Sequence, residues 1–209
     1  MRSFITLLTG LALAASLGAC QQKSASTAVT DDDMSLGNPA AKVTVIEYAS
    51  VACPHCADWD MNVFQAFKKK YVDTGRVHYI AREALVHDPA LAAAGFLTAR
   101  CAGKDKYFQV VDAIYHAQAD MESSGQPRAA LLNIAKSAGL TEAQFNTCIN
   151  DDKALAAINA RWQKYIDEDK INSTPTFVIN GKVYDSGEMP LPQLDAAIAE
   201  AEGAKKAGS

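Results

Sequence analysis

Two short apolar runs enclose an amphipathic stretch in the first part of the chain. Residues 43–48 are β-branched and apolar at nearly every position, which is typical of a central strand with both faces covered. Residues 58–72 place apolar side chains at spacings of three and four, which predicts a helix. Residues 77–81 predict a second strand. A strand, a helix and a strand in so few residues predict a right-handed crossover between two parallel strands.

The middle of the chain has the pattern of helices alone. Helices are predicted at residues 90–102, 107–117, 127–138 and 154–165. Gly103 and Gly139 follow two of these stretches and are typical stop signals. Thr141 with Gln144 three residues later predicts a capping box that opens a further helix.

The last part of the chain returns to a sheet pattern. Residues 176–179 and 182–184 predict two strands, and Asn180-Gly181 between them favours the positive φ angles of a type I′ hairpin. Residues 194–205 predict a closing, alanine-rich helix. The predicted order is therefore βαβ, a helical block, and ββα, which is an α/β fold with an inserted helical domain.

The extreme N-terminus has the pattern of an export signal. A positive start at Arg2 precedes an apolar run over residues 4–19, which is short for a membrane-spanning helix and typical of a secretory signal. Leu17-Gly18-Ala19-Cys20 resembles a bacterial lipobox, in which cleavage precedes the cysteine and its thiol is lipidated. The alternative is a soluble exported protein that is cut nearby, for example after Ser16. The polar residues 21–33 predict a flexible tether.

Composition and charge exclude several classes of protein. The chain has 209 residues, 49% of them hydrophobic, so it can bury a core and is neither disordered nor fibrous. Lysine and arginine number 20 and the acidic residues 24, a formal net charge of -4 without a basic patch. This balance argues against a nucleic acid as the partner.

Cys53-Pro54-His55-Cys56 is the strongest chemical motif in the sequence. It follows the first predicted strand and begins the helix, where the three-residue spacing lets the two sulfurs form a disulfide. Unpaired N–H groups and the helix dipole at this position favour a thiolate at Cys53. Pro54 suits the first helical turn, and His55, when protonated, adds a positive neighbour. A disulfide that releases a stable thiolate is a strong oxidant.

Other interpretations of this motif are weaker. A zinc site would need a second CxxC, which the sequence lacks. Haem attachment would need histidine where Ala57 stands. An inert structural disulfide remains open, although so tight a loop at a strand–helix corner is unusual for a structural crosslink.

The CPHC motif between a βαβ start and a late Thr174-Pro175-Thr176 resembles the DsbA-like thiol oxidoreductases of the thioredoxin fold. The resemblance covers about residues 36–203. It implies that Pro175 is a cis-proline packed against the active-site disulfide and that Thr174 offers backbone groups to an extended substrate chain. It also implies that Glu47 is a buried carboxylate beneath the disulfide, where a raised pKa lets it move protons for Cys56. A trans Pro175 and a solvent-facing Glu47 are the alternatives.

The N-terminal pattern and this resemblance together predict a division of the chain. It has five parts: a signal peptide at 1–19, the lipidated Cys20 and tether at 20–35, the first half of the thioredoxin fold at 36–84, a helical insertion at 85–150, and a connecting helix with the second half at 151–209.

Cys101 and Cys148 lie on two helices of the predicted insertion. In an oxidising compartment we expect them to form a structural disulfide, worth about 4 kcal/mol on the chain-entropy model. Buried free thiols and a second, regulatory redox pair are the alternatives.

The sequence thus favours an enzyme of the bacterial periplasm that donates the Cys53–Cys56 disulfide to folding exported proteins with reduced cysteines. Gln21 after Cys20 favours a lipid anchor in the outer membrane. We expect a monomer that needs no metal or organic cofactor, and the resemblance implies reoxidation by a membrane protein of the DsbB kind.

One feature departs from the oxidase pattern. Thr174 is common before the cis-proline of isomerases, where oxidases often carry valine. The isomerase subfamily relies on a dimerisation domain ahead of the fold, and residues 20–35 do not resemble one. An isomerase or reductase with the same dithiol is therefore the nearest alternative, and a metal-binding lipoprotein using Cys53, Cys56 and His55 is a more distant one.

Overall fold

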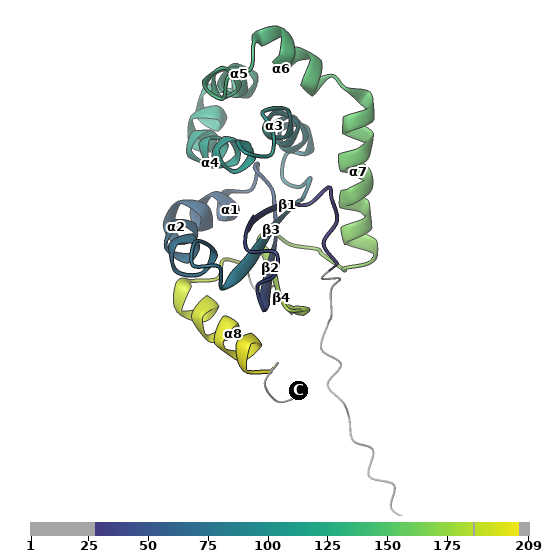
Figure 1. The fold of residues 1–209 in the computed structure, drawn as a ribbon. Helices are drawn as coiled ribbons and strands as arrows, with labels where there is room; N and C mark the ends of the chain where they lie inside the picture. Colours follow the sequence, from purple (N-terminus) through teal and green to yellow (C-terminus); the bar gives the residue numbers. More distant parts are fainter. Residues whose placement is uncertain (1–27, 186, 205–209) are drawn as a thin grey trace, which may run out of the picture.

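A mixed five-stranded sheet forms the centre of the molecule (Figure 1). The computed structural model describes residues 28–185 and 187–204. The strands are β1 (Met34–Gly37), β2 (Val43–Ala49), β3 (Val77–Glu83), β4 (Thr176–Ile179) and β5 (Lys182–Tyr184). Their spatial order is β1-β3-β2-β4-β5, and only β2 and β3 pair in parallel. Strand β2 is therefore central and leads directly to the CPHC motif.

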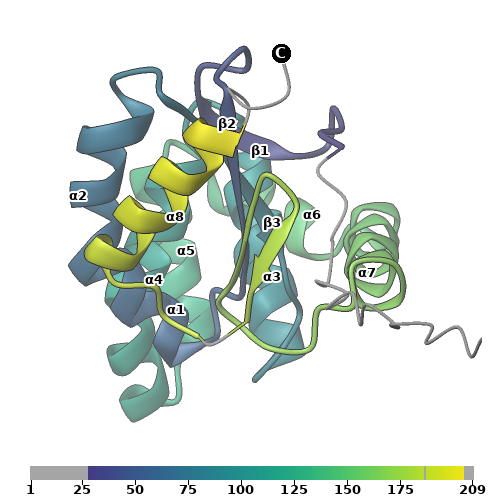
Figure 2. The same cartoon turned by 90° about the horizontal axis from the view of Figure 1, so that it is seen from below.

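Helices cover both faces of this sheet and one of its ends (Figures 1 and 2). They are α1 (Pro54–Trp59), η1 (Asp60–Phe64), α2 (Gln65–Phe67), η2 (Lys68–Val72), α3 (Pro89–Cys101), α4 (Tyr107–Ser124), α5 (Pro127–Ser137), α6 (Glu142–Ile149), α7 (Asp152–Asp167) and α8 (Leu191–Ala204). Among them, η1 and η2 are π-helical turns within the continuous run from α1 to η2.

Two apolar layers hold the sheet in place. On one face, Trp59 and Phe67 of the first helical run and Leu194 of α8 share a cluster with β2, β3 and β4. On the other face, Ile46 and neighbouring strand residues pack against Tyr165 of α7. Side chains alternate across a strand, so β2 contributes apolar side chains to both layers. This explains why β2 is apolar at nearly every position.

Helices α3 to α6 form a separate apolar cluster at the end of the sheet where the CPHC motif lies. The capping box predicted at Thr141 is present, with Gln144 as its partner. Helix α4 continues past the predicted residue 117 to Ser124 and ends at Gly125, whose φ is 64°. The hydrophobic pattern does not predict this last part of α4, because its residues are mostly polar. Met121 is the residue that it buries.

The N-terminal edge of the sheet differs from the prediction. Residues 34–37 form β1, which pairs antiparallel with β3. The predicted tether over residues 20–35 is therefore too long, because the sheet already begins at Met34. Asp33 is also buried and forms an ion pair with Arg82 of β3 (Asp33 Oδ1 to Arg82 Nε, 3.3 Å). A four-residue strand of mixed polarity gives little local signal, because its stability comes from pairing with a distant strand.

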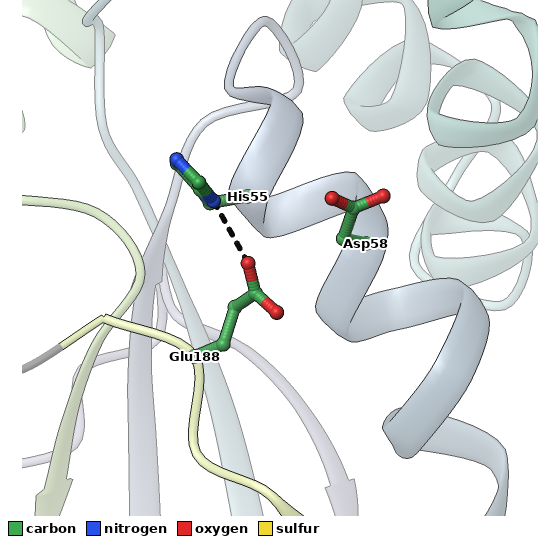
Figure 3. A group of neighbouring side chains, drawn as sticks. All are labelled: His55, Asp58 and Glu188. Atoms are coloured by element: carbon green, nitrogen blue, oxygen red, sulfur yellow. Dashed lines mark hydrogen bonds and ion pairs between the residues drawn. The ribbon is translucent and has the colours of Figure 1, made fainter.

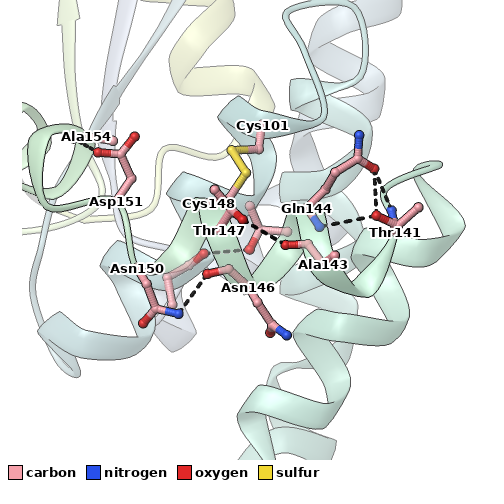
Figure 4. The surroundings of a disulfide bond; sticks show 12 residues. Cys101, Thr141, Ala143, Gln144, Asn146, Thr147, Cys148, Asn150, Asp151 and Ala154 are labelled. Carbon is pink, nitrogen blue, oxygen red and sulfur yellow. Dashed lines mark hydrogen bonds between the residues drawn. A yellow bond between two sulfur atoms is a disulfide. The ribbon is translucent and has the colours of Figure 1, made fainter.

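Cys101 at the end of α3 and Cys148 on α6 form a disulfide (Figure 4). Their Cα atoms lie 6.3 Å apart and 47 positions separate them in sequence. The bond thus connects the first helix of the helical block to its fourth, close to the surface.

We predict that replacing both cysteines with serine lowers the free energy of unfolding by about 4 kcal/mol, because the unfolded chain regains the entropy of a long loop. Equilibrium denaturation of the oxidised protein and the double variant measures this difference. Equal midpoints and slopes would show that the bond contributes nothing to stability.

Candidate active site

Cys53 and Cys56 lie where β2 gives way to α1. Cys53 is the N-cap of α1, Pro54 occupies its first turn, and the Cys53 carbonyl accepts a hydrogen bond from the Ala57 N–H at 3.1 Å. Both side chains are buried free thiols in this structure. Pro54 and His55 between them are exposed, so the motif presents its middle to solvent and its sulfurs to the protein interior.

The two thiols have opposite acidities. The pKa of Cys53 is lowered to about 5, chiefly because the Cys56 side chain donates a hydrogen bond to the thiolate, while the Thr174 side chain and the Cys56 backbone add smaller effects. Burial raises the pKa of Cys56 well above its ordinary value. The reduced pair therefore holds one thiolate, on Cys53, and one thiol, on Cys56.

The loop before β4 lies directly against Cys53. Its Thr174–Pro175 peptide bond is cis, and the Cys53 thiol, when it is protonated, donates a hydrogen bond to the Thr174 carbonyl oxygen at 3.6 Å. The Thr174 hydroxyl oxygen is buried and has no hydrogen-bond partner among the described residues. Residues 121 positions apart in sequence thus meet at the reactive sulfur.

Glu47 lies beneath the motif, in the centre of the sheet. It is 4% exposed on β2, and it accepts a hydrogen bond from the Tyr79 hydroxyl of β3. Burial is the main reason why its pKa rises to about 8, and the charges of Asp60 and Cys53 raise it further. The alternative of a solvent-facing Glu47 is excluded by its position.

His55 forms an ion pair outside the motif (Figure 3). Its Nδ1 lies 2.8 Å from Oε1 of Glu188, which precedes α8, and this contact raises the pKa of the imidazole. The indole N–H of Trp59 donates to the Met189 carbonyl at 2.8 Å and fixes the same loop. Asp58 lies near His55 and Glu188, and all three side chains are exposed. Each offers one atom that could bind a metal ion, and these atoms lie within 4.8 Å of one another.

Comparison with known protein families gives a match over nearly the whole described chain. A family model described as thioredoxin matches residues 29–200. The chain belongs to the thioredoxin family. A relative from Rickettsia conorii named "Putative protein-disulfide oxidoreductase" is 33% identical over 174 residues, which are 83% of this chain and 61% of that protein. The chain therefore spans about three-fifths of the length of this curated relative.

Solved structures show the same thioredoxin fold. The chain is similar to alpha-DsbA1 of Wolbachia pipientis, with a TM-score of 0.74 and 28% identity over 84% of this chain and 94% of that one. BdbD of Bacillus subtilis, at 20% identity, has a TM-score of 0.73 over 86% of this chain and 96% of its own. The fold predicted from the sequence, a thioredoxin fold with a helical insertion of the DsbA kind, is confirmed.

Two side chains at this thioredoxin-fold site were not found from the sequence. Gln118 of α4 donates to the carbonyl oxygens of Val51 at 2.7 Å and of Cys53 at 3.2 Å, which holds the loop before α1. Glu188 contacts His55 as described. Neither residue lies in a motif, and each meets the site only through the folding of distant elements.

The predictions for the N-terminus concern residues outside those that the structure describes. These are the signal peptide over residues 1–19 and lipidation of Cys20. Within residues 28–185 and 187–204, none of the helices combines the length and the apolar character needed to span a membrane.

Proposed function

We propose that this protein is an exported thiol:disulfide oxidoreductase that donates its Cys53–Cys56 disulfide to folding proteins. The observation that carries the proposal is the unequal pair of thiols at the start of α1, with a pKa of about 5 at Cys53 and a strongly raised pKa at Cys56. A pair that holds a stable thiolate when reduced gives up its disulfide readily.

The reaction transfers two electrons from substrate to enzyme. A substrate thiolate attacks the Cys53 sulfur, the Cys53–Cys56 bond breaks, and Cys56 leaves and takes up a proton. A second substrate thiol loses its proton and attacks the substrate sulfur of the mixed disulfide. The substrate disulfide forms, and Cys53 leaves as the stabilised thiolate. The substrate is oxidised and the enzyme dithiol is the reduced product.

The neighbours of the two cysteines support distinct roles. Glu47, with a pKa of about 8, is suited to give a proton to the departing Cys56 and to take it back during reoxidation. Thr174 and Pro175 lie beside Cys53, and the extended chain there offers backbone groups to a substrate strand. Pro54 and His55 form the exposed surface across which a substrate approaches.

The cellular setting belongs to the same proposal. The apolar run over residues 4–19 and the lipobox-like ending at Cys20 favour export to the periplasm and a lipid anchor, with the outer membrane favoured. Substrates are folding exported proteins with reduced cysteines. A DsbB-like membrane protein restores the disulfide, and the enzyme acts as a monomer without a metal or organic cofactor.

The test is the reduction potential of the Cys53–Cys56 pair in glutathione buffers. We expect a value more oxidising than protein disulfide isomerase, which lies at about -180 mV. A value near that of thioredoxin, about -270 mV, would overturn the oxidase assignment and identify a reductase. Rapid rearrangement of a scrambled disulfide protein would favour the isomerase. Stoichiometric zinc or copper on the reduced protein would instead support the metal-binding alternative.

A further inference from the structure

Asp60 is a second buried carboxyl group near the two cysteines, and the reaction above does not use it. It begins η1, directly after α1, and is 7% exposed. Its Oδ2 atom is buried and has no hydrogen-bond partner among the described residues. Buried carboxyl oxygens without a partner are uncommon, because the desolvation of a polar group is costly unless a partner or an ordered water replaces the lost solvent.

A small cavity joins Asp60 to Glu47. It holds about 30 Å³ of space for the centre of a water molecule, and both carboxyl groups line it. One water needs about 10–15 Å³ of such space and two to four polar partners. The two carboxyl groups and the tyrosines that line the cavity can supply these partners. The site is therefore large enough and polar enough for ordered water.

We propose that Asp60 and a water held between it and Glu47 form a proton path that connects the buried Cys56 to the surface. This proposal deepens the proposed function, because it explains how Glu47, enclosed beneath the motif, recovers the proton that it gives to Cys56. Glu47 is 4% exposed and lies on a central strand, so solvent does not reach it directly.

The proton transfers balance in the oxidising direction. When the Cys53–Cys56 bond breaks, the Cys56 thiolate takes the Glu47 proton. The Glu47 carboxylate then takes a proton from the water, which takes one from Asp60. Asp60 is reprotonated from solvent. The proton that enters replaces the one that the first substrate thiol released on ionising, and reoxidation of the dithiol runs the path in reverse.

The pKa values of the two carboxyl groups favour proton transfer from Asp60 to Glu47. The pKa of Asp60 is raised to about 7, first by burial and then by the charge of Asp112, while that of Glu47 is about 8. A proton therefore moves from Asp60 to Glu47 with little cost, and Asp60 exchanges protons readily at neutral pH.

The surroundings of Asp60 contain few other charges. The titratable and charged groups that line its cavity or act on its charge are Glu47 of β2, Tyr79 and Arg82 of β3, and Tyr107, Asp112 and Tyr115 of α4. Arg82 binds Asp33, and the Tyr107 hydroxyl donates to Glu83, so each is engaged away from Asp60.

Asp112 marks the outer end of the path. It is half-buried on α4, and its Oδ1 lies 3.9 Å from Nε2 of His116, whose side chain is 59% exposed. The path thus runs from Cys56 through Glu47 and Asp60 to the solvent-facing side of α4.

The experiment follows reduction of the Cys53–Cys56 disulfide by excess dithiothreitol in the full chain, using rapid quenching and thiol alkylation at a series of pH values. Rates are corrected for the thiolate fraction of dithiothreitol. We expect Asp60→Asn to slow the reaction by on the order of a hundredfold, the lower end of the range for loss of a proton-transfer group. The ionisation near pH 7 should disappear from the profile, and Asp60→Glu should restore it.

A second variant tests the path without altering a buried side chain. Asp112→Asn removes the negative charge that raises the pKa of Asp60, so the midpoint of the profile should move to lower pH. Asp120→Asn, an exposed carboxyl on the same helix outside the cavity, is the matched control and should leave the rate and the profile unchanged.

The outcomes separate this proposal from the proposed function. An unchanged rate and profile in Asp60→Asn, or a slower rate with an unchanged profile, would overturn the proton path. Cys56 must gain a proton whenever dithiothreitol reduces the disulfide, so the path is tested whether the enzyme is an oxidase or a reductase. The oxidase assignment fails only on the reduction potential of the unaltered protein.

Discussion

Replacing Cys53 with serine is expected to abolish the oxidation of a reduced substrate peptide. Cys53 is the sulfur beside the Thr174–Pro175 loop, and its depressed pKa makes it the better leaving group of the pair. Cys56 alone can form neither the internal disulfide nor a stable thiolate, because burial raises its pKa. Turnover should fall to the rate of the peptide with the glutathione buffer alone, as measured by the appearance of the peptide disulfide.

Cys56→Ser is the matched variant, since it also removes the internal disulfide but keeps the reactive sulfur. In a buffer that contains glutathione disulfide as the oxidant, Cys53 should first form a mixed disulfide with glutathione, and substrate thiols should then displace the glutathione. The mixed disulfides between Cys53 and substrate should accumulate, because the Cys56 thiol that would displace the substrate is absent. Mass spectrometry after acid quenching identifies these species. Turnover by Cys53→Ser, or mixed disulfides on Cys56 instead of Cys53, would contradict the assigned order of attack.

The position of the two cysteines could be predicted because the relevant signals are local. An apolar strand, a CxxC and an amphipathic helix follow one another with only residues 50–52 between the strand and the CxxC, so the order along the chain places Cys53 at the helix start. The hairpin could also be predicted from a local signal, the Asn180-Gly181 dipeptide. Asn180 has a φ of 46° and Gly181 a φ of 90°, and this dipeptide favours such positive angles.

Residues that act through distant contacts could not be found in this way. Glu188 reaches His55 across 133 positions, and Asp60 matters because folding brings it to the same cavity as Glu47. On the sequence, Asp60 is one more polar residue on an amphipathic helix. Its burial arises because α4 packs against η1 and shares a cavity with Asp60, and no local sequence pattern indicates this packing.

Ionisation of Cys53 in the reduced protein should have its midpoint near pH 5, about four units below an ordinary cysteine thiol. The Cys56 thiol is the largest cause, since it donates a hydrogen bond to the thiolate. The rate of alkylation by iodoacetamide across pH measures the midpoint. Cys56→Ala removes the donor and should raise the midpoint, while Cys53→Ser should eliminate the titration.

The same shift fixes how stability depends on pH. A pKa lowered from 9 to about 5 in the folded state stabilises the reduced fold fully above pH 9. The contribution declines as pH falls and vanishes as pH passes below 5. At pH 7 this contribution to the free energy of unfolding is about 3 kcal/mol. The pH is then two units above the folded pKa, and each unit contributes about 1.4 kcal/mol. The oxidised protein has no such thiolate, so its stability should lack this dependence. Parallel denaturation curves at pH 4 and pH 7 that show the same change in both redox forms would contradict a stabilised Cys53 thiolate, and with it the basis for strong oxidising power.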